Sequence, residues 1–115
     1  MAKENKELIE NKEIMEELEE ELDINKYTFS KPIKFEGEEY KEIILNLEGL
    51  TGKDIKEVSN ELVLKGEIMG LAETNKNFLA ALAARSAGLP IEFMDYIPAK
   101  DFSKITILVQ NFLLG

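Results

Sequence analysis

Apolar residues recur mainly at every second position between residues 27 and 47, which is the repeat of a β-strand with one buried face. The alternation stops once, at the polar stretch 36–39. Gly37 in this stretch supplies the backbone freedom of a tight turn, so the pattern predicts an antiparallel β-hairpin over residues 27–47. Pro32 lacks a backbone N–H, and we therefore expect the first strand to be an edge strand or to contain a bulge.

Beyond the hairpin the apolar spacing changes to three or four residues, which is typical of an α-helix. The first helical segment has three apolar residues on one face: Ile55, Val58 and Leu62. Thr51 and Asp54 have the spacing of a capping box, and Gly66 suits a helix end, which predicts a helix over about residues 52–65. The following connection, residues 67–74, carries three apolar residues that we expect to fold inward: Ile68, Met69 and Leu71.

A second helix is predicted over about residues 75–88. Asn75 is a good N-cap residue, and Gly88 and Pro90 mark the end of the segment. Residues 78–84 are apolar without interruption. We expect such a helix to be buried on several sides, either in its own domain or against another chain, because a large exposed apolar band is rare on a monomer.

A third helix is predicted over about residues 98–113, with Pro98 at its start and Asp101 in its first turn. Its apolar surface is wide and comprises Phe102, Ile105, Leu108, Val109, Phe112 and Leu113. Burial of one such side chain stabilises a fold by about 1.5–3 kcal/mol. The predicted fold class is α+β, with an N-terminal antiparallel β-hairpin packed on a bundle of about three α-helices.

The first residues of the chain differ in charge from the rest. Residues 1–23 hold ten acidic residues and three lysines, whereas residues 24–115 hold thirteen acidic and eleven basic residues. A weak apolar stripe at helical spacing competes with the mutual repulsion of the acidic run 16–21. We interpret residues 1–26 as a flexible acidic arm, either a frayed helix or disordered. One hypothesis for its role, which stays open, is that it keeps an aggregation-prone core in solution.

Composition excludes most catalytic chemistry. The 115 residues suffice for one domain, and the net charge of −9 disfavours a nucleic acid partner. Cysteine and histidine are absent, which removes thiolate nucleophiles, Cys/His zinc sites and histidine acid–base catalysis. The sequence has neither the apolar core of a signal peptide nor a window of roughly 18 apolar residues, so we expect a soluble cytoplasmic protein.

Motifs for phosphate binding, nucleophilic catalysis or metal binding are not found either. The best carboxylate pair, Asp95 and Asp101, is interpreted as two helix-capping residues. Arg85 is expected to pair with Asp95 or to extend its charged group to the helix rim. We therefore expect a protein that is not an enzyme, needs no cofactor or metal, and functions through its surfaces.

Three segments together resemble a known family. They are LNLEGLTGKD at residues 45–54, LAARSAGLP at residues 82–90, and the segment 99–113 with AKDF at its start and VQNFL at its end. In this order and spacing they resemble the small tail assembly chaperones of long-tailed bacteriophages, the family of P2 E-like and Mu-like tail assembly proteins. The resemblance covers about residues 40–114 and makes residues 27–115 the chaperone domain, without extending to the acidic arm.

The resemblance implies a non-catalytic protein of the host bacterial cytoplasm, absent from the mature virion. It would bind the tape measure protein, keep it soluble and help to load tail tube subunits. Helix-in-groove packing suits such a helical client, and four apolar residues of the third helix are the predicted contact residues: Phe102, Ile105, Val109 and Phe112. The competing interpretation is that these four residues fill the core of the domain itself.

Other partners follow from the same resemblance: the tail tube protein and a longer form of the chaperone, made by ribosomal frameshifting. The run 111–113 could be encoded by successive thymines on which a ribosome slips. Self-association is expected through the edge strand and the apolar second helix. Two alternatives remain open, namely a minor structural component of the phage tail and a DNA-binding regulator that uses helices 54–65 and 75–88.

Overall fold

The computed structural model describes residues 25–67 and 75–115 of the chain. The predicted acidic arm, except for its last two residues, lies outside these described residues. The three apolar residues that were expected to fold inward, Ile68, Met69 and Leu71, lie outside them as well.

The predicted hairpin is confirmed. Strand β1 (Lys26–Phe35) pairs antiparallel with β2 (Glu38–Ile44), and the two form a two-stranded sheet. Glu36 and Gly37 between them have φ values of 49° and 82°, the left-handed backbone that a two-residue hairpin turn requires. The pairing register shifts between Thr28 and Ile33, the segment that contains Pro32, so the predicted irregularity of the first strand is present too.

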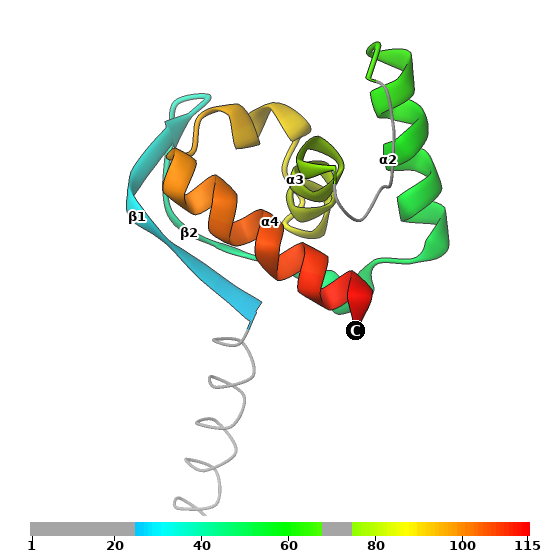
Figure 1. The fold of residues 1–115 in the computed structure, drawn as a ribbon. Helices are drawn as coiled ribbons and strands as arrows, with labels where there is room; N and C mark the ends of the chain where they lie inside the picture. Colours follow the sequence, from blue (N-terminus) through cyan, green and yellow to red (C-terminus); the bar gives the residue numbers. More distant parts are fainter. Residues whose placement is uncertain (1–24, 68–74) are drawn as a thin grey trace, which may run out of the picture.

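Three helices follow the hairpin, which confirms the predicted α+β class (Figure 1). They are α2 (Gly52–Leu64), α3 (Lys76–Ser86) and α4 (Ala99–Leu114). Two short 3-10 helices, Leu47–Gly49 and Ile91–Asp95, were not predicted.

Local signals determine where the helices begin and end. The Thr51 backbone N–H donates to the Asp54 carboxylate at 2.8 Å, as expected for a capping box. The Asn75 side chain accepts a backbone N–H of the first turn of α3 at 3.1 Å. Gly66 and Gly88 adopt φ values of 91° and 71° just after α2 and α3, which places both helix ends close to the predicted positions.

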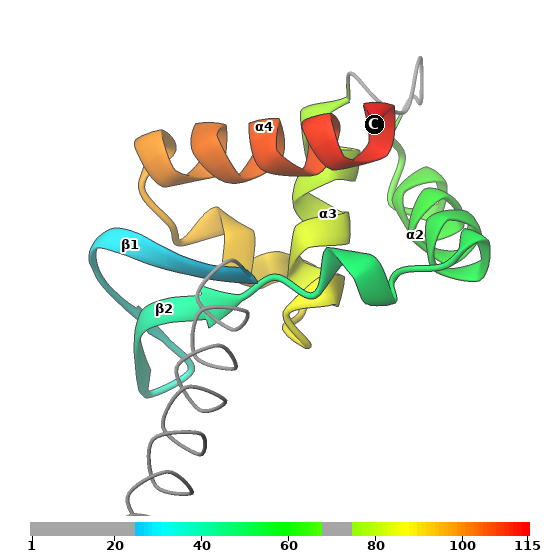
Figure 2. The same cartoon turned by 90° about the horizontal axis from the view of Figure 1, so that it is seen from below.

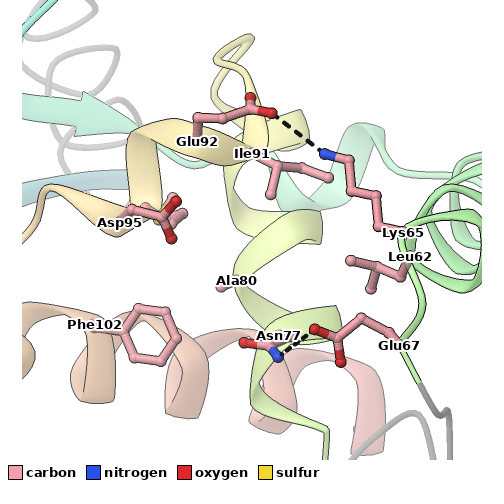
Figure 3. A pocket seen from close by; sticks show the side chains of 10 residues that line it. Leu62, Lys65, Glu67, Asn77, Ala80, Ile91, Glu92, Asp95 and Phe102 are labelled. Carbon is pink, nitrogen blue, oxygen red and sulfur yellow. Dashed lines mark hydrogen bonds and ion pairs between the residues drawn. The ribbon is translucent and has the colours of Figure 1, made fainter.

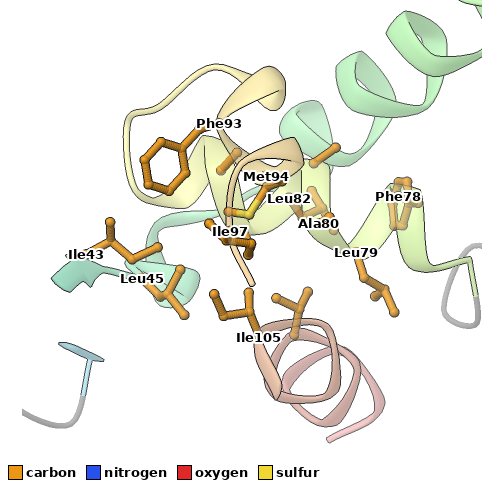
Figure 4. Close-up of a cluster of buried hydrophobic side chains, with 14 of the residues drawn as sticks. Ile43, Leu45, Phe78, Leu79, Ala80, Leu82, Phe93, Met94, Ile97 and Ile105 are labelled. Carbon is orange, nitrogen blue, oxygen red and sulfur yellow. The ribbon is translucent and has the colours of Figure 1, made fainter. Parts of the chain in front are cut away.

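Helix α3 forms the centre of the molecule. Figure 2 shows it crossing below α4, with α2 along one side. All residues from Phe78 to Ala84 are buried, and side chains of the hairpin, the 3-10 helix Ile91–Asp95 and α4 surround it (Figure 4). The first of the two alternatives for this helix is therefore correct: it is buried within its own domain, and it offers no apolar surface for the predicted self-association.

Three aromatic rings of the hairpin pack on Phe93, in the 3-10 helix Ile91–Asp95. The Phe93 ring lies 5.0 Å from the ring of Tyr40, 5.3 Å from that of Phe35 and 5.9 Å from that of Phe29, measured between centroids. Such edge-to-face and tilted aromatic pairs add to the stabilisation that burial provides. The unpredicted 3-10 helix therefore joins the hairpin to the helices.

Candidate functional site

The predicted contact residues of α4 lie in different environments. Ile105 and Val109 are fully buried, with no exposed surface, and belong to the hydrophobic core. These two residues fill the core of the domain itself, as the competing interpretation expects. Phe102 is partly buried, and Phe112 is exposed.

The exposed surface of α4 carries four large apolar side chains, which we call the α4 surface. Their exposed fractions are 48% for Ile107, 45% for Leu108, 39% for Phe112 and 67% for Leu114. Leu108 and Phe112 are four residues apart and so lie on the same side of the helix. Leu108 also lines a shallow hollow of about 90 Å³ with residues near the open end of the hairpin, including Tyr27, Leu45 and Leu47.

A second hollow lies beside Phe102, at the other end of α4. This pocket has a volume of about 200 Å³. Its apolar wall residues come from α2, α3, the 3-10 helix Ile91–Asp95 and α4, and they are Leu62, Ala80, Ile91, Met94 and Phe102. Figure 3 shows the Phe102 ring directed from α4 into the space between that helix and the 3-10 helix.

Charged and polar side chains surround the opening of the pocket. Lys65 Nζ lies 3.3 Å from a Glu92 carboxylate oxygen, and Asn77 Nδ2 donates to Glu67 Oε1 at 3.0 Å. The bonds of the Glu92 carboxylate to its own backbone N–H and to Lys65 lower its pKa, and its proximity raises the pKa of Lys65. Asp95 completes the rim and, among the described residues, forms no hydrogen bond or ion pair.

Asp101 connects the hairpin to α4 and is not a helix cap. Its buried carboxylate accepts the Tyr27 hydroxyl at 2.7 Å, the Ser30 hydroxyl at 2.8 Å and the Ser30 backbone N–H at 3.2 Å. Burial would raise the pKa of this carboxyl, but these hydrogen bonds outweigh burial and lower the pKa below its usual value. Burial, together with the bond to Asp101, raises the pKa of Tyr27 to about 12.

This arrangement corrects the interpretation of Asp95 and Asp101 as two capping residues. Asp101 holds two separate parts of the fold together, whereas Asp95 lies exposed at the pocket rim. A carboxylate that already accepts three hydrogen bonds has little capacity left to act as a base. We therefore assign Asp101 a structural role.

The expected partner of Arg85 was also wrong. The Arg85 guanidinium donates to Asp54 at 2.7 Å and contacts Glu57, so it pairs with α2 and not with Asp95. The backbone N–H of Thr51, and then Arg85, lower the pKa of Asp54. The ion pair fastens α2 against α3 at a mostly solvent-exposed position, where such pairs contribute little stability.

The alternative of a DNA-binding regulator required α3 to enter a groove of the duplex. Its side chains from Phe78 to Ala84 are buried inside the domain, so α3 has no face to present. Within residues 25–67 and 75–115, no group of three or more acidic side chains is placed to hold a metal ion. None of the helices in this same part of the chain is long and apolar enough to cross a membrane.

A comparison with known protein families identifies a match. The sequence model of a protein family described as "Phage tail assembly chaperone proteins, E, or 41 or 14" matches residues 26–114, from the first residue of β1 to the last residue of α4. No curated protein and no solved structure matches the chain.

Proposed function

The chain belongs to the phage tail assembly chaperone family, and from this membership we propose that it binds the tape measure protein of its phage and keeps it soluble. The bound client would be released as tail tube subunits are loaded. This work takes place in the host bacterial cytoplasm, and the chaperone is absent from the mature virion. The role requires a binding surface and no catalytic group, so the protein is not an enzyme.

The main observation behind the proposal is that α4 exposes large apolar side chains that are not needed for the core of the domain. Ile107, Leu108, Phe112 and Leu114 are exposed within two turns of one helix, next to the core residue Val109. Apolar residues concentrated in this way on a surface mark a site of association. A helical client with an apolar stripe would lie along α4 and bury these side chains together with its own.

Two of the four predicted contact residues are accessible to a client. Phe112 belongs to the α4 surface, and Phe102 lines the pocket at the other end of the same helix. Ile105 and Val109 support both from below, because their side chains fill the core under the helix. We propose that Phe112 contacts the client directly and that Ile105 and Val109 act as positioning residues.

Co-expression with the tape measure protein of the same genome tests the proposal. The client should be soluble and should co-purify with the unmodified chaperone. The double variant Leu108→Asp, Phe112→Asp should lose the client, because two charges would have to be buried in an apolar contact. Asn60→Asp is the control, since it places a charge at an exposed polar position of α2, outside the α4 surface.

Circular dichroism of each variant separates loss of binding from loss of folding. Val109→Asp is unsuitable, because this residue is fully buried and the substitution would unfold the domain. A client that stays insoluble and unbound with the unmodified chaperone would contradict the proposal. The chain would then be better explained as a minor structural component of the tail, which mass spectrometry of purified particles would detect.

Further partners belong to the same proposal. They are the tail tube protein, a second copy of the chain bound along an edge of the hairpin, and a longer frameshifted form. The longer form requires a run of thymines in the codons for residues 111–113 and an overlapping reading frame downstream. Sequencing the gene and identifying a second product by mass spectrometry would test this part.

A further inference from the structure

We infer that the pocket beside Phe102 receives one large apolar side chain of the client, and that its acidic rim selects a client helix with a lysine or arginine one turn away. The occupant is thus a helical segment in which an apolar anchor and a basic residue are three or four positions apart. The inference rests on the proposed function, because it specifies which segments of the client are bound.

The size of the pocket fits a single side chain. Its volume of about 200 Å³ is smaller than the roughly 300–1,000 Å³ of sites that enclose a whole small-molecule ligand. Ala80 of α3 lines the hollow and contributes only a methyl group to its wall, between Phe102 of α4 and Leu62 of α2 (Figure 3). An anchor residue that enters an apolar hollow of this kind is typical of the centre of a protein interface.

Phe102 gives this pocket an aromatic wall. The residue is only partly buried, although Ile105, one turn further along α4, is fully buried. A partly exposed aromatic ring beside a hollow favours an aliphatic or aromatic guest, because burying it adds apolar contact area.

The charge of the pocket rim indicates the charge of the client residue next to the apolar anchor. Three acidic residues, Glu67, Glu92 and Asp95, stand at the opening with one basic residue, Lys65, and the rim is therefore negative. This acidity is local, because the described residues as a whole hold twelve acidic and eleven basic residues. Glu92 is paired with Lys65, and Glu67 is partly buried and accepts a hydrogen bond from Asn77, which leaves Asp95 as the most accessible carboxylate for an incoming cation.

Peptides that tile the tape measure protein of the same genome are the probes, and the purified full chain is the receptor. The peptides that bind most tightly should contain a large apolar residue with lysine or arginine three or four positions away. Replacement of that basic residue by glutamate should weaken binding about tenfold. Asp95→Lys should weaken the original peptide similarly and should restore binding of the glutamate peptide.

Two further variants complete the design. Ala80→Leu fills the pocket and should weaken every peptide that uses it. Glu48→Lys is the matched control for Asp95→Lys, because it makes the same charge change at an exposed residue that does not line the pocket, and it should leave binding unchanged. Asp95 is exposed, so its variant remains informative even if Ala80→Leu disturbs folding.

The outcomes separate this inference from the proposed function. If the tape measure protein co-purifies normally but Asp95→Lys and Ala80→Leu bind all peptides as the unmodified chain does, the inference is wrong and the proposed function stands. If the unmodified chain binds neither the full client nor any peptide, both are wrong. A dimer that Ala80→Leu dissociates without effect on client binding would show that a second copy occupies the pocket, which also overturns the inference.

Discussion

Helices α3 and α4 are both rich in apolar residues, yet the fold uses them differently. In α3 every residue from Phe78 to Ala84 is buried, whereas α4 buries Ile105 and Val109 and exposes four other large apolar side chains. The alanines of α3 let neighbouring elements approach it from several sides, while α4 lies against the rest of the domain with one face only (Figure 2). Apolar content alone therefore does not show which helix forms the core and which forms a surface for association.

A matched pair of substitutions gives the largest contrast between the two helices. Phe78→Ala in α3 should lower the free energy of unfolding by about 3–5 kcal/mol, because it leaves a cavity in the core. Phe112→Ala in α4 should lower it by only about 1 kcal/mol, since 39% of the surface of this residue is already exposed to water. Urea denaturation monitored by circular dichroism measures both, and equal losses would contradict the comparison.

Asp101 is the polar contact that fixes α4 against the hairpin, and its removal should have the next largest effect. Asp101→Ala leaves the Tyr27 hydroxyl and two donors of Ser30 without their acceptor. We expect a loss of about 2–4 kcal/mol in the free energy of unfolding. Asp95→Ala is the control, because Asp95 is exposed; a similar loss in both variants would show that the buried network is not the cause.

The same network predicts how stability depends on pH. The pKa of Asp101 is lower in the folded protein than its ordinary value of 3.8 in the unfolded chain. The ionised carboxylate therefore stabilises the fold fully above pH 3.8, and this stabilisation is lost as the pH falls through the lower pKa of the folded state. The pKa of Tyr27 is raised from 10.0 to about 12, so its contribution is lost as pH rises between these values. Thermal unfolding across pH should show both losses, and Tyr27→Phe should reduce the alkaline one. An alkaline loss of unchanged size in Tyr27→Phe would rule out this origin.

Phe112 should matter more for the client than for the fold. Phe112→Ala should weaken binding of the tape measure protein about tenfold, because aromatic side chains at the centre of an interface contribute strongly to affinity. Titration of the purified client in mild solubilising conditions measures this, with Asn60→Ala on α2 as the control outside the α4 surface. Unchanged affinity would exclude Phe112 from the contact.

Arg85 should show the smallest effect. Arg85→Met keeps the aliphatic length but removes the ion pairs to Asp54 and Glu57 that fasten α2 to α3. We expect a small decrease in Tm at low salt that disappears at high salt, because exposed ion pairs are screened. A decrease in Tm that is independent of salt would indicate that packing of the side chain, and not its charge, holds α2 in place.

Much of the fold could be predicted because it depends on local signals. The Gly37 turn, the capping box of Thr51 and Asp54 and the Asn75 cap each act within four residues, and each is found where the sequence places it. The 3-10 helix Ile91–Asp95 has too few residues to show a period, so its existence was missed. Its Phe93 nevertheless joins the hairpin to the helices.

The site was predicted less well, because it depends on contacts between distant residues. Helical spacing identified a wide apolar surface on α4 but could not show that Ile105 and Val109 point inward while Leu108 points outward. Asp101 and Tyr27 are 74 residues apart in sequence, and Arg85 and Asp54 are 31 apart. The sequence does contain one signal for the exposed apolar surface. Helix α4 has more large apolar residues than one buried face can accommodate, so some of them must face solvent.

Side-chain footprinting by hydroxyl radicals, read out by mass spectrometry in the free chaperone and in its complex with the tape measure protein, tests the central claim most directly. Leu108 and Phe112 should react in the free protein and become protected in the complex. Phe78 should stay protected in both, because it is already buried in the core. A complex in which Leu108 and Phe112 react as strongly as in the free protein would contradict the assignment of α4 as the surface that holds the client.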